Sequence, residues 1–529
     1  MADVSTAFDA RAPRRDLLCH GMRGNLMNII KKNLIANFGG SICIAITGVI
    51  FVPLYIHFLG IEAYGLVGIF ASLLAISGLF DMGLSSTLNR EIARLTVQDG
   101  NAQEIRDLVR TLEIPYWAIG MLIGVIVIVL SPTIAYHWVN AKNLSPKTVQ
   151  NAIMIMGLSF AFQWPISFYS GGLMGLQRQV LLNSINAVMA ALRGLGAVLI
   201  LWLISPTINA FFTWQIIISI VNTGLLGFFL WHTLPHASQK ATFQKQLLVG
   251  IWRFAAGMTG ISILATIILQ MDKIILSKML TLEMFGYYAL AGVVGMFLYR
   301  IIGSVYFAIY PIFIQLVASD DLEGLKNFYH KSSQFMSVMI LPVSVVIAMF
   351  SYEIMLLWTQ NSVTAEKCHL LVSILICGTA LNGLMNIPYA LQLANGWTRL
   401  ILYTNLISLL IEVPVIIYMT GKYKALGGAS VWVMINCGYV LFEIYFMHKR
   451  LLPYEKWRWY CVDIGIPLGA ALLAAGIFRL TVPTPHNKIM LGGYIFIVST
   501  ITWAVTVVAT PATRLWIKSV ILKPRFCVV

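Results

Sequence analysis

The chain has 529 residues, of which 59% are hydrophobic and only 11% charged, whereas roughly a quarter of the residues are charged in ordinary soluble domains. No water-facing shell could cover so much apolar surface, so a soluble multidomain enzyme is excluded. Disordered, coiled-coil and collagen-like chains are excluded too, because 12% of the residues are aromatic and glycine follows no period. The sequence therefore predicts an all-α integral membrane protein that lies mostly within the bilayer.

The N-terminal residues 1–32 are too polar for a cleavable signal peptide, and we expect a basic segment at the cytoplasmic membrane surface. Fourteen apolar runs follow, each close to the roughly 20 residues that a spanning helix needs. They are 34–56, 63–86, 112–131, 151–175, 184–204, 208–231, 254–276, 284–310, 332–352, 368–394, 400–420, 427–447, 460–479 and 489–510. Open sheets cannot span lipid and the runs are too continuous for barrel strands, so each run predicts a helix.

Lysine and arginine are distributed unevenly over the loops between these spans. With fourteen spans both termini share a side, and the termini and loops of that side carry 25 of the 36 basic residues. The opposite loops carry 7, and 4 lie within spans. This bias predicts that both termini are cytoplasmic. It also explains the net charge of +15 through anionic membrane lipid, without a nucleic-acid partner.

The chemistry-bearing residues show no pattern of a cofactor or metal site. The seven cysteines are scattered without a CxxC pair or metal-ligand spacing, and the histidines form no ligand pair. The longest outer loop, 132–150, contains no Asp, Glu or Cys. We therefore expect no metal, no cofactor and no enzyme activity, which argues against a membrane-embedded glycosyltransferase or polymerase.

An internal repeat organises the chain. Shifting the sequence by 221 residues aligns 41–70 with 262–291 without a gap, and Glu62 and Gly65 then meet Glu283 and Gly286. Because the shift spans six helices, the halves are predicted to be parallel repeats. The expected organisation is a basic cytoplasmic segment (1–32), an N-lobe of six helices (33–231), a cytoplasmic linker (232–253), a C-lobe of six helices (254–450), and two further helices with a cytoplasmic tail (451–529).

Several short motifs resemble one transporter family. They are Pro53-Leu54-Tyr55-Ile56 with Leu59-Gly60-Ile61-Glu62-Ala63-Tyr64-Gly65, Asp81-Met82-Gly83-Leu84-Ser85-Ser86-Thr87-Leu88-Asn89-Arg90, Asp272-Lys273-Ile274-Ile275-Leu276 and Gly286-Tyr287-Tyr288-Ala289. In order and spacing they resemble the polysaccharide transporter (O-antigen flippase) family of the multidrug, oligosaccharidyl-lipid and polysaccharide exporter superfamily. The resemblance runs from about Asn33 to Arg450.

The resemblance implies a flippase in the bacterial inner membrane that carries out no enzyme chemistry. Its substrate would be an undecaprenyl-pyrophosphate-linked glycan, such as an O-antigen, capsule or exopolysaccharide repeat unit. The polymerase and chain-length proteins of the same pathway would be candidate partners, beside membrane lipid. The sugar is not readable from these motifs.

Basic residues within the spans are the candidate substrate ligands. Arg193 and Arg300 lie too deep in their spans to reach the interface easily, and arginine binds phosphate bidentately. We expect both in a cavity that binds pyrophosphate, unless a carboxylate such as Glu412 neutralises them. Lys273 is a weaker candidate for a phosphate contact.

Acidic residues suggest ion coupling or gating. Glu412 and Glu443 are the carboxylates best positioned within spans to bind a proton or sodium ion, although structural pairing is an equal alternative. Asp272 adjoins Lys273, so the two side chains point about 100° apart on a helix and suit a structural or gating pair. Asp81 and Arg90 flank a predicted cytoplasmic turn, where capping and gating are expected.

Two relatives within the superfamily remain alternatives. A cation-coupled multidrug antiporter would share the two-lobe body but would need acidic rather than basic cavity residues. A peptidoglycan-precursor flippase, also with fourteen spans, is not excluded by the composition.

Overall fold

A computed structural model describes residues 40, 43–44, 46–78, 80–81, 83–96 and 101–515, without the side chains of 77, 248–263 and 265. Within these residues the structure is built of helices, as predicted, with a single β-type bridge between Asn140 and Thr281. Ten helical segments are long and apolar enough to cross a membrane. The predicted segment 1–32 and the last residues of the predicted tail, from 516, lie outside the described residues.

Each of the ten segments coincides with a predicted span, except one that contains two. They consist of α5 (Ala102–Thr133) with the π-helix η1 (Ile134–Trp138), α6 (Pro146–Gln163) with α7 (Pro165–Gly175), α8 (Gln179–Leu203), α9 (Ile208–Thr233), α11 (Leu282–Ala318), α12 (Leu322–Met349), α14 (Ser362–Ala394), α15 (Thr398–Gly438) with η2 (Tyr439–Glu443) and α16 (Ile444–Leu451), α17 (Lys456–Arg458) with η3 (Trp459–Gly465) and α18 (Ile466–Thr481), and α19 (Lys488–Ala509). Shorter apolar helices α2 (Val52–Leu59) and α3 (Ile61–Ser77), and α10 (Lys245–Met279), lie at the other predicted spans. The count of fourteen stays a prediction.

The segment from α15 to α16 has 54 residues. At 1.5 Å per residue it would be about 80 Å long, far more than the roughly 30 Å of a hydrocarbon core. Lys424 breaks it with non-helical backbone angles (φ 55°, ψ −136°). A Cβ on Gly427 would collide with the carbonyl oxygen of Met419, so only glycine fits where the chain turns back. The break falls between the spans predicted at 400–420 and 427–447.

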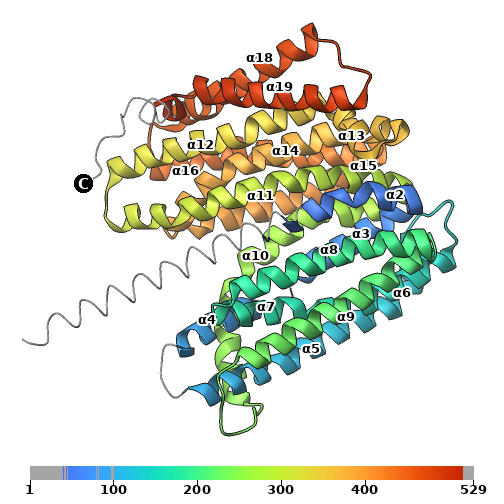
Figure 1. Cartoon of the computed structure of the whole chain (residues 1–529). Coiled ribbons are helices and arrows are strands. Elements are labelled where there is room, and N and C mark those ends of the chain that lie inside the picture. The colour runs from blue at the N-terminus through green and yellow to red at the C-terminus, as the bar shows by residue number, and fades with distance from the viewer. Residues whose placement is uncertain are drawn as a thin grey trace, which may run out of the picture. The chain divides into compact units, whose positions relative to one another are not determined.

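The chain divides into two compact units, which Figure 1 allows the reader to follow by colour. Unit 1 comprises 1–54, 81–129 and 153–257, and unit 2 comprises 55–80, 130–152 and 258–529. In unit 1, α4 (Leu84–Thr96) packs on α7, and α9 packs on both α7 and α8. A Cβ on Gly171 of α7 would collide with the backbone of Ser85, which explains how closely α4 approaches. The lobes expected at 33–231 and 254–450 stay a prediction.

In unit 2, α14 is central: it packs on α11, α12 and α15, and α3 packs on α11. The crossing of α3 and α11 follows the sequence repeat. A Cβ on Gly65 would lie 2.5 Å from the carbonyl oxygen of Leu282, and a Cβ on Gly286 would collide with that of Ile61. Gly65 and Gly286, like Ile61 and Leu282, are 221 residues apart. Equivalent glycines of the two repeats thus meet in one pseudo-symmetric helix crossing.

The C-terminal helices α18 and α19 lie against α12 in unit 2 (Figure 1). Apolar contacts around Val346, Phe350 and Val498 form one part of this packing. The other part is polar: the buried His330 ring of α12 bonds through Nδ1 to Asp463 (2.5 Å) and through Nε2 to Glu455 (3.1 Å). Because both ring nitrogens of the buried His330 are hydrogen-bonded, this residue holds the chain segment that precedes α18 against α12.

Candidate transport site

Arg193 lies in the middle of α8 in unit 1 and is half-buried. Its Nη1 donates to the side-chain carbonyls of Gln163 (3.1 Å) and Gln215 (3.2 Å), and Nη2 lies 3.5 Å from the Ser219 hydroxyl. These three acceptors are neutral, and they orient the guanidinium. An oriented cation at mid-span can bind a phosphate oxygen.

Arg300 lies in the middle of α11 in unit 2, on the face opposite the core of that unit. The core face of α11 presents Leu298, Ile302 and Val305, all buried, whereas Arg300 and Ser304 are exposed. Among the described residues no hydrogen bond or ion pair reaches the Arg300 guanidinium. A lipid-facing arginine at this depth would be costly. This position therefore suits a water-filled space.

Two acidic side chains of unit 2, Asp272 of α10 and Glu412 of α15, come close enough for their charges to interact. Asp272 accepts a hydrogen bond from Tyr288 (2.5 Å), and its other oxygen, Oδ1, is buried and has no hydrogen bond from the described residues. Glu412 is 2% exposed, and its Oε2 likewise has no partner among the described residues. Two carboxylates that each hold a buried acceptor oxygen form a site that can take up a proton or a cation.

Lys273 does not pair with its neighbour Asp272. Its ammonium donates to the backbone carbonyl of Leu269 (3.3 Å) and the side chain of Gln270 (3.2 Å). The two adjacent side chains thus point in different directions, as the helical geometry predicts.

Glu443, in η2, is buried and accepts a hydrogen bond from Gln392 of α14 (2.7 Å). Thr404 is a second hydrogen-bonding neighbour. Neutral donors thus hold Glu443, and its role in ion coupling stays a prediction.

Asp81 and Arg90 lie at the start and middle of the α4 region in unit 1. Asp81 accepts hydrogen bonds from the hydroxyls of Tyr116 (2.5 Å) and Ser85 (2.8 Å), and the Tyr116 hydroxyl also contacts Ser167 (2.6 Å). Asp81 therefore ties the beginning of α4 to α5 and α7. Its role in gating stays a prediction.

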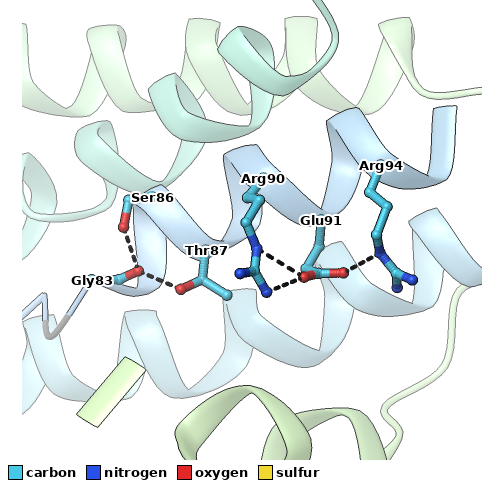
Figure 2. A network of polar contacts seen from close by, with 6 residues as sticks. All are labelled: Gly83, Ser86, Thr87, Arg90, Glu91 and Arg94. Carbon is cyan, nitrogen blue, oxygen red and sulfur yellow. Dashed lines mark hydrogen bonds and ion pairs between the residues drawn. The ribbon is translucent and has the colours of Figure 1, made fainter. Parts of the chain in front are cut away.

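Arg90 takes part in a surface network on α4, shown in Figure 2. Both Arg90 (2.7 Å) and Arg94 (2.8 Å) form ion pairs with Glu91. Burial opposes ionisation of this carboxyl, but the hydrogen bonds and charges of the two arginines outweigh it and lower the pKa of Glu91. At the start of the helix, the Ser86 and Thr87 hydroxyls both donate to the Gly83 carbonyl (2.8 Å each). More than half of each arginine side chain is exposed.

The charged candidates could be chosen from the sequence, whereas the polar residues that contact them could not. Gln163, Gln215 and Ser219 orient Arg193, and Tyr288 binds Asp272. An uncharged polar side chain in an apolar span is the signal that could have found them, since such groups need a partner inside the membrane.

The sequence family described as "Polysaccharide biosynthesis protein" matches residues 30–317, more than half of the chain. The chain belongs to this family. The resemblance in the short motifs is thereby confirmed. A Shigella flexneri protein named "Putative O-antigen transporter" is 21% identical over 413 residues, which are 77% of this chain and 94% of that protein.

Solved structures share the fold of this family member. The lipid II flippase MurJ, in an inward closed conformation, has a TM-score of 0.67 at 12% identity, over 93% of this chain and 99% of MurJ. A multidrug resistance MATE family transporter of the MOP superfamily, in an inward-facing conformation, has a TM-score of 0.63 at 14% identity, over 77% and 94% of the two chains. The named relative and these solved structures are transporters or flippases, and this chain is a multi-pass membrane protein that shares the fold of the solved structures.

Proposed function

We propose that this protein is a flippase that moves a polyprenyl-pyrophosphate-linked oligosaccharide across the bacterial inner membrane by alternating access. Both termini lie in the cytoplasm, and the glycan is an O-antigen, capsule or exopolysaccharide repeat unit. Within the shown family, the observation that carries the proposal is Arg300, an exposed mid-span cation that no described residue neutralises. Arg193, oriented by neutral acceptors, is the second phosphate ligand.

A pyrophosphate with a sugar head cannot cross hydrocarbon unaided. It needs a hydrated path and fixed cations, and guanidinium groups stay charged at every relevant pH. The lipid tail needs no protein cavity, because it can remain in the bilayer. Arg193 in unit 1 and Arg300 in unit 2 would each bind phosphate as the head group crosses the membrane.

The acidic pair Asp272 and Glu412 would couple transport to an ion. In each, one buried carboxylate oxygen has no hydrogen bond from the described residues. Uptake of a proton or sodium ion would give this oxygen a partner and reduce the repulsion between the two carboxylates. Glu443, which accepts hydrogen bonds from Gln392 and Thr404, would serve structure rather than coupling.

The test is translocation of a fluorescent lipid-linked oligosaccharide in proteoliposomes. Arg193→Gln and Arg300→Gln should each lower the rate by about tenfold or more, because a charged hydrogen bond contributes roughly 1.5–3 kcal/mol. Lys449→Gln is the matched control, since it removes one exposed positive charge at the end of α16. Wild-type rates in both arginine variants would overturn the proposal.

A multidrug antiporter is the second candidate, favoured by the buried acidic pair Asp272 and Glu412. Efflux of a cationic dye, measured in the same proteoliposomes, distinguishes the antiporter from the flippase. Dye efflux that Glu412→Gln abolishes and Arg300→Gln leaves intact would support the antiporter. Absence of dye efflux, with loss of lipid translocation in Arg300→Gln, would support the flippase.

A further inference from the structure

Three tyrosines of unit 2 form a cluster that the proposed phosphate site does not use. The rings of Tyr306 and Tyr310 lie nearly parallel, 10° apart, with centroids 5.5 Å from each other. Tyr389 of α14 completes the cluster, its ring centroid 6.1 Å from that of Tyr306. Helices α11 and α14 lie side by side (Figure 1). All three tyrosines are half-buried, so part of each ring faces out of the core.

The three hydroxyl groups have no hydrogen-bond partner among the described residues. Nearby tyrosines differ: Tyr299 donates to Asn382 (3.3 Å) and Tyr288 to Asp272. The three tyrosines lie near the ends of the predicted spans 284–310 and 368–394, where a hydroxyl that lacks a protein partner can meet interfacial water or a polar ligand. The cluster is therefore built to face water or a polar ligand.

Uncharged polar side chains and open space surround most of the cluster, and Glu443 of η2 is near enough for its charge to act on Tyr389. Asn382 and Asn386 precede Tyr389 by seven and three residues, so the three share one stripe of α14. The Asn386 amide donates to the Asn382 backbone (3.0 Å), while its side-chain oxygen accepts nothing from the described residues. On α11, Gly303 lies between Tyr299 and Tyr306, and a Cβ there would meet no atom within 4 Å.

We infer that Tyr306, Tyr310, Tyr389 and Asn386, here called the tyrosine surface, bind the sugar head of the transported lipid. The inference rests on the proposed function, in which Arg300 binds the pyrophosphate. Aromatic faces carry negative quadrupole charge and attract the C–H face of a sugar ring, and hydroxyl and amide groups match sugar hydroxyls. A cationic drug would instead require carboxylates, which this surface lacks.

The spacing along α11 fits one ligand that reaches both groups. Arg300 precedes Tyr306 by six residues, or about 9 Å along the helix axis and about 120° around it, and Gly303 lies between the two on the helix surface. A pyrophosphate on Arg300 would thus hold its first sugars beside the tyrosine rings.

The experiment compares two probes on the purified full chain in nanodiscs. The probes are undecaprenyl pyrophosphate and the same lipid carrying an N-acetylhexosamine disaccharide, with affinity measured by ligand-protected thermal unfolding. Wild-type protein should bind the glycan-bearing lipid more tightly. Tyr306→Leu and Tyr389→Leu should weaken that binding by about threefold to tenfold each and leave bare-lipid binding within about twofold.

Three variants make the result specific. Tyr306→Phe keeps the ring and should retain part of the glycan preference. Tyr352→Leu removes a half-buried ring of α13, outside the tyrosine surface, and should leave both affinities unchanged. Arg300→Gln should weaken binding of both lipids.

The outcomes separate the two proposals. Loss of glycan preference in the tyrosine variants, with bare-lipid binding intact, supports the inference. Equal affinity of wild-type protein for the two lipids, or tyrosine variants that weaken both lipids alike, overturns it. Bare-lipid binding that Arg300→Gln and Arg193→Gln leave unchanged would instead overturn the proposed phosphate site.

Discussion

Asp107 joins the predicted linker 232–253 to helix α5 within unit 1. The side chain is 3% exposed and accepts hydrogen bonds from the Thr242 amide (2.7 Å), Gln244 (2.8 Å) and Gln103 (3.0 Å). A single carboxylate thus satisfies a backbone donor and orders a stretch without regular structure. The linker is held at this point rather than free.

Removing this carboxylate should destabilise unit 1. We expect Asp107→Ala to lower the free energy of unfolding by about 2 kcal/mol, because the Thr242 amide and the Gln244 and Gln103 side chains lose their charged acceptor. The measurement is thermal unfolding in detergent followed by tryptophan fluorescence. Glu104→Ala, on the exposed side of the same helix, is the control and should change the free energy by less than about 0.5 kcal/mol. Equal effects of the two variants would contradict the anchoring role.

The Glu91 network gives a pH-dependent contribution to stability. The two arginines lower the pKa of Glu91 in the folded state. The network therefore contributes its full stability above the pKa of Glu91 in the unfolded chain. This stability is lost as the pH falls through the lower pKa of the folded state. Because both arginines are more than half exposed, the effect should stay below about 1 kcal/mol. Glu91→Gln should therefore unfold at a slightly lower temperature than wild type at pH 7, and the difference should vanish near pH 3. Glu366→Gln, at an exposed position on α14, is the control. If its unfolding temperature differs from that of wild type with the same dependence on pH, the effect does not come from the Glu91 network.

At the scale of helices, the sequence predicts positions well because apolar length alone determines where a span can lie. The break near Lys424 was readable from the polar residues between 420 and 427, and the structure has its non-helical backbone there. Partners were not readable. Nothing local relates His330 to Asp463 or Gln163 to Arg193, because these contacts depend on which helices pack together.

The crossing of α3 and α11 depends on repeat-related glycines. At Gly286 an added Cβ would collide with the Ile61 backbone, which cannot move aside as a side chain can. We expect Gly286→Ala to cost about 1–3 kcal/mol of stability by overpacking and to slow transport. Gly292→Ala is the matched control on the same helix, where a Cβ meets nothing within 4 Å; it should be neutral or slightly stabilising. The stability and the translocation rate of both variants are measured by thermal unfolding and by the transport assay. A Gly286→Ala variant with wild-type stability and rate would mean that α3 and α11 do not cross this closely in the membrane.

The whole molecule has a charge distribution that fixes its expected orientation. The loops predicted to be outside carry few lysines and arginines, whereas those predicted to be inside carry most of them. The same asymmetry brings basic loops to the anionic leaflet. If the lipid-linked substrate is assembled on that side, the molecule must take it up there and release it opposite.

This orientation predicts which loops a membrane-impermeant thiol reagent reaches in intact cells. In a cysteine-free background, Lys142→Cys and Lys367→Cys should react, since both exposed positions lie in loops predicted to be outside. Lys240→Cys and Lys449→Cys, equally exposed but predicted to be cytoplasmic, should react only after the membrane is permeabilised. The two inner positions control for reagent leakage, and lipid translocation by each variant controls for correct insertion. Labelling of Lys240→Cys in intact cells would mean that the predicted orientation is wrong. Labelling of only one outer position would mean that the number of spans between 142 and 367 is odd rather than even.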